Sequence, residues 1–248
     1  MDPMARQRVL IVGASSGLGR ALAEQYAGKN CDLALVSRDA RDLAAIRADL
    51  SWRFRVDVRD YACDITDRSR QPALREWLKS LGSVRYACLV AGGTFEGPGN
   101  IPDEGAIQKS MDLNYFAIVS LMNGLVSSSF PETILVVSSI AVTAPRGANL
   151  AYTAAKTALD TYAQSLRHFI AVRKMNTKIQ ILRLGYMDSI FTRGLNLRFP
   201  VAQAAEVARY LWRIRDTKEG VFYYPGYWWL ICAVLQSIPW FLYRRLRF

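Results

Sequence analysis

The sequence has 248 residues, which is long enough to bury the core of one domain. Its 51% apolar and 21% charged residues are typical of a globular protein, and they exclude a disordered chain, a collagen-like chain and a small disulfide scaffold. The formal net charge of +11 indicates an anionic partner, such as a nucleic acid, a membrane surface or a phosphorylated ligand, without choosing among them.

Short apolar runs alternate with helical periods along the chain. The runs predict strands at 8–13, 31–38, within 54–64, and at 86–93, 133–139, 178–185 and 220–225. Strands that alternate with helices, such as those predicted at 17–28 and 39–50, indicate βαβ units and a parallel sheet. We therefore expect one doubly wound α/β domain of the Rossmann type with about seven strands. Residues 1–226 form its main part, and 227–248 form an apolar C-terminal extension of the same domain.

The cysteines and the single histidine do not predict a metal site or a nucleophile. No two cysteines have CxxC spacing, so we expect buried free thiols in a reducing compartment. His168 lies in a helical stretch, and no G-x-S-x-G motif accompanies it, so we interpret it as structural. The N-terminus has no signal-peptide apolar region, so we expect a cytoplasmic protein. The cysteines are Cys31, Cys63, Cys88 and Cys232.

A glycine-rich turn follows the first predicted strand and opens the first predicted helix. Glycines let the backbone approach a pyrophosphate closely, and the helix N-terminus offers unpaired N–H groups to the phosphates. This context is what a dinucleotide-binding turn requires. The residues expected to bind the cofactor here are Gly13, Ser15, Ser16, Gly17, Leu18 and Gly19.

A tyrosine and a lysine lie four residues apart in a later helical stretch. Tyr152 and Lys156 therefore share one face of the predicted helix, one turn apart. A phenol has an ordinary pKa near ~10, and a fixed cation beside it favours the phenolate and lowers that pKa. This pair predicts acid–base chemistry, although YxxxK alone is common by chance.

Two further positions complete a set of four features in order. Ser139 ends a predicted strand thirteen residues before Tyr152, and Asn114 lies in a central helical stretch. Together with the GxxxGxG spacing of Gly13 to Gly19, these features make the chain resemble the short-chain dehydrogenase/reductase family over roughly residues 8 to 225.

The resemblance implies an oxidoreductase that transfers a hydride between a nicotinamide and a carbonyl or alcohol group. Tyr152 would exchange a proton with the substrate oxygen, and Ser139 would stabilise the charge on that oxygen. Lys156 would lower the phenol pKa and hold the nicotinamide ribose, and Asn114 would support a water that relays protons to Lys156. The family also implies a homo-oligomer, a dimer or a tetramer.

The end of the second predicted strand favours NADP(H) over NAD(H). It carries Arg38 and no carboxylate, and a guanidinium can bind a 2′-phosphate through charge-assisted hydrogen bonds. Ser15 could add a hydroxyl to that phosphate, and we interpret Asp39 as the N-cap of the next helix. The resemblance implies further cofactor contacts at Asp64, Ile65, Ala91, Gly92, Gly185 and Ser189.

Three segments depart from the family pattern. Leu89-Val90-Ala91-Gly92 stands where Asn-Asn-Ala-Gly is usual, which leaves open what makes this segment rigid. Leu184-Gly185 replaces the usual Pro-Gly, and Ser189 replaces a threonine that usually faces the cofactor. None of these changes removes a proposed catalytic group.

The segment 221–243 has no charged residue and ends against Arg244, Arg245 and Arg247. Three interpretations stay open: an interfacial membrane contact, a dimer contact or pocket wall, and a membrane span interrupted by prolines. The tail also resembles that of decaprenylphosphoryl-2-keto-pentose reductase-type members of the family. That likeness implies a lipophilic or lipid-linked sugar substrate and a peripheral position on the inner membrane face.

A rival interpretation is a non-catalytic NADP(H)-binding regulator or scaffold on the same fold. The intact Ser139, Tyr152 and Lys156 favour the enzyme, because a regulator does not need an acid–base set. We expect no nucleic-acid partner, because the basic residues do not cluster along one predicted helix.

Overall fold

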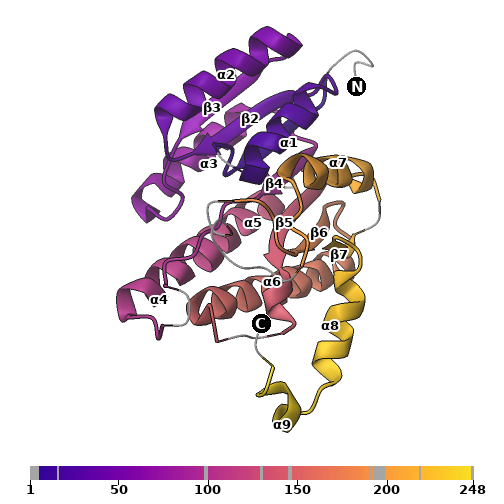
Figure 1. Cartoon of the computed structure of the whole chain (residues 1–248). Coiled ribbons are helices and arrows are strands. Elements are labelled where there is room, and N and C mark those ends of the chain that lie inside the picture. Colours follow the sequence, from indigo (N-terminus) through magenta and orange to yellow (C-terminus); the bar gives the residue numbers. More distant parts are fainter. Residues whose placement is uncertain are drawn as a thin grey trace.

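The structure is a computed structural model that describes residues 6–15, 17–97, 100–128, 131–144, 147–189, 192, 199–217 and 219–246. The described residues form one seven-stranded sheet in the order β3-β2-β1-β4-β5-β6-β7 (Figure 1). Every pair of neighbouring strands is parallel, which confirms the expected Rossmann-type fold. The strands are β1 Arg8–Val12, β2 Asp32–Ser37, β3 Val58–Ala62, β4 Tyr86–Leu89, β5 Thr133–Ser139, β6 Lys178–Leu184 and β7 Gly220–Tyr224.

Helices connect the strands and cover both faces of the sheet. The α-helices are α1 Gly17–Ala27, α2 Ala40–Phe54, α3 Gln71–Ser80, α4 Glu104–Met111, α5 Ala117–Ser127, α6 Leu150–Val172, α7 Ala204–Ile214, α8 Trp228–Ser237 and α9 Trp240–Tyr243. Shorter turns are η1 Arg68–Arg70, η2 Asp112–Phe116 and η3 Ile140–Val142, of which η2 is π-helical.

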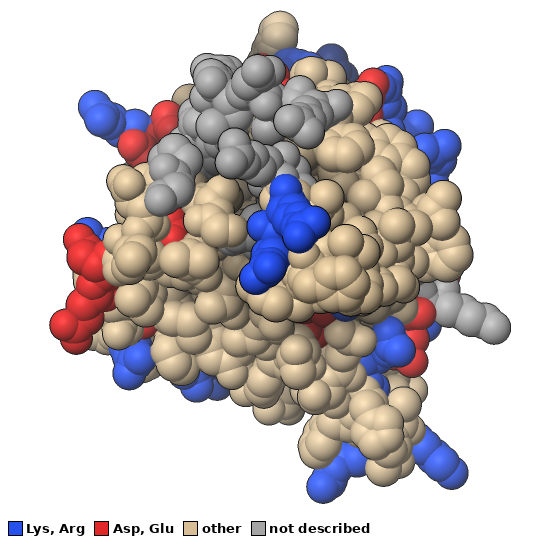
Figure 2. Space-filling view, turned by 60° about the horizontal axis from the view of Figure 1, so that its bottom comes forward, with Lys and Arg blue, Asp and Glu red and all other residues tan. Residues whose placement is uncertain are grey.

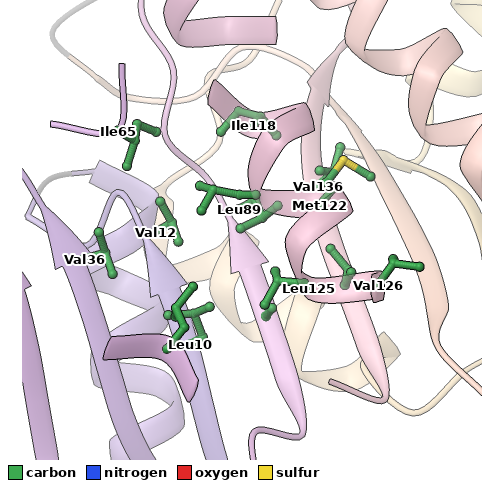
Figure 3. Packing of buried hydrophobic residues seen from close by; sticks show 14 of the residues in the cluster. Leu10, Val12, Val36, Ile65, Leu89, Ile118, Met122, Leu125, Val126 and Val136 are labelled. Carbon is green, nitrogen blue, oxygen red and sulfur yellow. The ribbon is translucent and has the colours of Figure 1, made fainter. Parts of the chain in front are cut away.

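The alternation of side chains along each strand produces two hydrophobic cores. On β1, Leu10 and Val12 pack into the core beneath α3, α5 and α6, whereas Val9 and Ile11 pack into the core beneath α1, α2 and α7. Figure 3 shows the first of these cores, where side chains of four strands meet Ile118, Met122, Leu125 and Val126 of α5. Burial on both faces explains why these strands are apolar throughout.

The thiols are buried, whereas the histidine lies on the surface. All four cysteines are buried and free, as expected. His168 is exposed on the last turns of α6.

The expected strand 86–93 ends early. β4 stops at Leu89, because the N–H groups of Val90 and Ala91 both donate to the carbonyl oxygen of Val12, at 3.0 Å each. The chain therefore leaves the β-ladder while its sequence is still apolar. These two hydrogen bonds, which need no asparagine side chain, hold the segment that departs from the family pattern.

The direction of winding reverses at β1. β2 and β3 lie on one side of it and β4 to β7 on the other, so the carboxyl ends of β1 and β4 form the topological switch point, where open α/β sheets generally bind ligands. The candidate site residues that the structure describes lie at or after the carboxyl ends of strands, or on helices next to that edge.

The C-terminal helices extend away from the sheet (Figure 1). Among the described residues no helix has the length and apolar content needed to cross a bilayer, and α8 covers only Trp228–Ser237. Most of the surface on the side where α8 and α9 lie is uncharged (Figure 2). Basic side chains stand among the uncharged ones, and the acidic side chains lie mainly at the margins.

Candidate active site

The glycine turn has the close packing that a nucleotide-binding loop needs. Gly13 has φ +97°, a conformation that L side chains rarely adopt, and a Cβ there would lie 2.7 Å from the nitrogen of Ala91. A Cβ at Gly19 would collide with the carbonyl oxygen of Gly13. Gly17 starts α1 with φ +51° and is exposed, and Leu18 is buried beneath the turn. Ser16 lies outside the described residues.

The end of β2 lies beside this turn. The hydroxyl groups of Ser15 and Ser37 share a hydrogen bond of 2.6 Å, which joins the glycine turn to β2. Arg38 follows and is exposed. Asp39 is the N-cap of α2, where its carboxylate accepts from the N–H groups of Arg41 and Asp42, so its interpretation as a cap is confirmed.

The expected adenine contacts follow β3. Ile65 is buried at 5% exposure. The carboxylate of Asp64 accepts hydrogen bonds from the N–H and the hydroxyl of Thr66, which fixes the turn after the strand.

Helix α6 carries Tyr152 in its first turn and Lys156 in its second. Tyr152 is half-buried and Lys156 is buried at 4% exposure. The ammonium group of Lys156 donates to the carbonyl oxygen of Val137 at 3.0 Å, which ties α6 to β5. Burial lowers the pKa of Lys156 to about 8.

Asn114 fixes the loop after β4 from the π-helical turn η2. Its amide accepts from the N–H of Gly93 at 3.0 Å and donates to the carbonyl oxygens of Gly93 and Ser110 at 2.8 and 3.0 Å. A Cβ at Gly92 would lie 3.0 Å from Asn114 Oδ1 and 3.2 Å from Lys156 Nζ. A side chain at residue 92 would therefore crowd both polar groups.

The two serines that end β5 have different surroundings. Ser138 is buried and donates to Asp160 at 2.8 Å, and Asp160 also binds Arg183 through two hydrogen bonds of 2.7 and 3.0 Å. Ser139 lies at the strand end, and its hydroxyl accepts from the N–H of Ala141 at 3.1 Å. Ser138 thus belongs to a structural network, and Ser139 is the serine at the edge where the other site residues gather.

Gly185 lies at the end of β6 and is covered by Trp228 of α8. Its N–H donates to the carbonyl oxygen of Tyr224, and a Cβ would collide with the indole ring of Trp228. Ser189 follows, and its N–H donates to the hydroxyl of Thr192 at 3.1 Å. Residues 190, 191 and 193–198, which follow Ser189, lie outside the described residues.

Sequence reasoning missed two side chains beside these groups. Trp228 packs with Ile140, the residue after Ser139, and with Tyr186 and Phe199. Glu96 is buried and reaches the N-terminus of α6 from the loop after β4. No local motif marks either residue, because each contact joins segments distant in the sequence.

A family model described as short chain dehydrogenase matches residues 7–198. The chain belongs to the short-chain dehydrogenase family. Membership agrees with the seven-stranded parallel sheet and makes the protein an oxidoreductase of this family.

Curated relatives in the short-chain dehydrogenase family are distant. An uncharacterized oxidoreductase of Mycobacterium tuberculosis is 28% identical over 195 residues, which cover 76% of each chain. A hydroxysteroid 11-beta-dehydrogenase 1-like protein of Gallus gallus is 26% identical over 238 residues, which cover 92% of this chain and 81% of that protein.

Solved structures share the short-chain dehydrogenase fold along most of the chain. A short-chain dehydrogenase from Sphingobium yanoikuyae in complex with NADPH has a TM-score of 0.79 at 24% identity and covers 97% of this chain and 96% of its own. The L-sorbose reductase from Gluconobacter frateurii, complexed with NADPH and L-sorbose, has a TM-score of 0.78 at 21% identity and covers 89% of this chain and 95% of its own.

Proposed function

We propose that the protein transfers a hydride between NADP(H) and a carbonyl or alcohol group, with Tyr152 as the acid–base residue. The observation that carries this proposal is the buried, anchored ammonium of Lys156, one helical turn from Tyr152 and close against Gly92. A buried cation is costly to maintain, and in this position it favours the phenolate form of a neighbouring tyrosine.

The residues at the strand edge fit a nicotinamide dinucleotide. The glycine turn forms a cradle that Cβ atoms at Gly13 and Gly19 would fill, and α1 begins directly behind it. Ala91, Gly92, Gly185 and Ser189 would line the path from this turn toward Lys156, and Leu18 would support the turn from below. When bound, the nicotinamide would supply or accept the hydride.

Each polar residue then has one task in the proposed chemistry. Tyr152 gives a proton to the substrate oxygen in reduction and takes it back in oxidation, while Ser139 donates a hydrogen bond to the same oxygen. Lys156 keeps the phenolate accessible and can bind the ribose hydroxyls of the cofactor. The side-chain amide of Asn114 is paired with Gly93 and Ser110, so it supports proton relay to Lys156 by holding the backbone around Gly92.

The choice of NADP(H) rests on the end of β2. Arg38 is exposed beside the hydroxyl pair of Ser15 and Ser37, and the nearby carboxylate of Asp39 is engaged in capping α2. A 2′-phosphate at this position would meet a guanidinium and hydroxyl groups. Asp64 and Ile65, after β3, would border the adenine. Three structural neighbours were solved with NADPH, which supports the same choice, and one was solved with NAD.

The proposed substrate is lipophilic. Trp228, Tyr186 and Phe199 form an aromatic wall next to Ile140 and hence next to Ser139. The curated relatives include hydroxysteroid dehydrogenase-like proteins, and one structural neighbour is a bulky-bulky ketone specific alcohol dehydrogenase. A lipid-linked sugar and a steroid-sized ketone are both compatible with such a wall, because both present apolar surface beside a carbonyl or hydroxyl group.

The experiment for the proposed activity follows NADPH absorbance at saturating cofactor with steroid ketones, long-chain ketones and polyprenyl-phosphate sugars. We expect turnover with at least one class. Tyr152→Phe should lower it by about 100-fold or more while NADPH still binds. Equal turnover in the wild type and Tyr152→Phe would contradict the role of Tyr152. Cofactor binding without turnover of any class would favour the regulator.

The extension 227–248 is proposed to contact the cytoplasmic surface of a membrane peripherally. Trp229, Leu230, Val234, Trp240 and Phe241 are exposed large apolar side chains of α8 and α9. Arg244 and Arg245 follow them, and the sequence has no acidic residue after Glu219. Aromatic side chains with arginines suit the headgroup region of an anionic bilayer.

Flotation with phosphatidylglycerol vesicles tests this contact. The double substitution Trp229→Ser and Leu230→Ser should abolish flotation, because it removes apolar area from α8. Trp52→Ser removes an exposed tryptophan from α2, far along the chain, and should leave flotation unchanged. Failure of the full-length protein to float would reject the membrane contact.

A homo-oligomer, a dimer or a tetramer, is also proposed. Phe116, Phe169 and Val172 are exposed apolar residues at η2 and on α6, which can pack against the same faces of a second copy. Light scattering of the purified protein measures the mass directly, and a monomer at all concentrations would reject this proposal.

A further inference from the structure

The N-terminus of the helix that carries Tyr152 is held by a side chain from another part of the chain. Asn149 occupies the N-cap position of α6, and its side chain makes no capping hydrogen bond within the described residues. Instead, the carboxylate of Glu96 accepts from two backbone N–H groups, that of Ala151 at 3.1 Å and that of Tyr152 at 2.9 Å.

The position and burial of Glu96 both strengthen its hydrogen bonds to α6. The first N–H groups of a helix have no partner inside the helix, and they form the positive end of its dipole. Glu96 is buried at 9% exposure, so its charge-assisted hydrogen bonds are little screened by water. Because it uses both carboxylate oxygens, the side chain fixes two adjacent backbone groups at once.

The contact also joins two parts of the proposed active site. Glu96 comes three residues after Gly93, whose N–H and carbonyl oxygen are both bound by Asn114. The loop after β4 is therefore fixed to η2 at one end and to α6 at the other. Gly92, against Lys156, lies in the same loop.

The two site residues of α6 differ in what holds them. Lys156 lies in the second turn and is anchored to β5 through Val137. Tyr152 lies in the first turn, and helix ends fray unless a cap holds them. Loss of Glu96 would thus release the turn that carries Tyr152 while leaving Lys156 in place.

We propose that Glu96 is a positioning residue for Tyr152. It holds the first turn of α6 at a fixed distance from the loop of Gly92 and Gly93, so that the phenol stays aligned with Lys156. This inference rests on the proposed role of Tyr152 in acid–base chemistry. It assigns Glu96 no contact with substrate or cofactor.

The test compares Glu96→Ala, Glu96→Gln and the wild type in kcat, KM and NADPH affinity. We expect Glu96→Ala to lower kcat by roughly tenfold or more, because small misplacements of a reacting group cost that much or more. The dissociation constant for NADPH should change less than twofold. Glu96→Gln should lose less than Glu96→Ala, because its single amide oxygen can accept from one of the two N–H groups.

Asp103→Ala is the matched control. Asp103 caps the neighbouring helix α4 by accepting from the N–H of Ala106 at 2.7 Å, and α4 carries no proposed site residue. Its loss should lower stability without lowering kcat. An equal loss of kcat in Asp103→Ala and Glu96→Ala would mean general loosening and would overturn the proposal.

Two further readouts separate positioning from other effects. Amide hydrogen exchange at Ala151 and Tyr152 should accelerate in Glu96→Ala. If that variant does not fold, Glu96→Gln decides, since faster exchange with wild-type kcat would overturn the proposal. A direct charge effect predicts that Glu96→Gln equals Glu96→Ala and moves the pH profile of kcat to lower pH, which would also overturn it.

The outcome is separable from that of the proposed function. If Tyr152→Phe leaves turnover unchanged, the acid–base role of Tyr152 fails, and the positioning proposal fails with it. If Tyr152→Phe abolishes turnover while Glu96→Ala keeps wild-type kcat, only the positioning role is rejected.

Discussion

The ammonium nitrogen of Lys156 lies 3.0 Å from the carbonyl oxygen of Val137, between helix α6 and strand β5. A lysine buried to this degree is destabilising in its charged form, which is why burial lowers its pKa from 10.5 to about 8. The site therefore carries a cost in folding stability that depends on pH.

Lys156→Met should stabilise the protein at pH 7 by up to about 3 kcal/mol, the free-energy equivalent of the pKa change, and should abolish turnover. Below pH 8 the wild-type lysine is charged in both states, so its full desolvation cost is present. Between pH 8 and 10.5 the unfolded chain binds a proton that the folded chain does not, so wild-type stability rises relative to the variant. Urea denaturation at pH 7, 9 and 10.5 measures this gap, and a gap independent of pH would contradict the prediction.

Gly92→Ala should lower kcat by roughly tenfold or more, and crowding of two buried residues should lower the free energy of unfolding by about 1–3 kcal/mol. The added methyl group would lie 3.0 Å from Asn114 Oδ1 and 3.2 Å from Lys156 Nζ, so it would fill the space between them. Steady-state kinetics and a thermal melt give both quantities. Gly124→Ala is the control, because α5 offers that methyl group open space; it should keep kcat and gain stability. Wild-type kcat in Gly92→Ala would show that the space has no part in the reaction.

Arg38→Ala should weaken NADPH binding by about tenfold or more and leave NADH binding unchanged, because only NADPH carries the 2′-phosphate. Fluorescence titration of both cofactors measures the ratio. Arg53→Ala, at the other end of α2, removes an equal charge that is paired with Asp49, and it should affect the two cofactors equally. An unchanged ratio in Arg38→Ala would place the phosphate elsewhere.

Gly185→Ala should destabilise the wild type by about 1–3 kcal/mol, because its methyl group would collide with the ring of Trp228. In a Trp228→Ala background the same substitution should be nearly neutral, so a double-mutant cycle should show strong coupling. Gly226→Ala, where no atom of the described residues lies within 4 Å, gives the reference for an uncrowded glycine. Additive effects of the two substitutions would mean that the ring does not restrict residue 185.

The sequence predicts the centre of the sheet well because β1, β2, β4 and β5 are buried on both faces and are therefore mostly apolar. It predicts the end of β4 poorly, because Val90 and Ala91 are apolar like the strand although they lie beyond its end. Their N–H groups both donate to the carbonyl oxygen of Val12. It also cannot show that Asn114 lies in a π-helical turn, because backbone hydrogen bonding there depends on the contact with Gly93.

The candidate site is predictable where its residues lie within a few positions of each other in the sequence, as in the glycine turn and the Tyr152–Lys156 pair. The spacing of thirteen residues to Tyr152 favours Ser139 over Ser138 as the site serine. In the structure the hydroxyl of Ser138 donates to Asp160 instead. Glu96 and Trp228 could not be found this way. Their roles come from contacts with α6 and with Gly185, tens of residues distant in the sequence.

The packing of Trp228 on Gly185 also sets an order of assembly. The glycine turn, Ser139 and Tyr152 all precede β6, whereas α8 follows every described strand. During synthesis the nucleotide-binding half can thus fold before the aromatic wall beside Ser139 exists. A nascent chain at that stage would lack Trp228, so Gly185 and Ile140 would be uncovered until α8 is made.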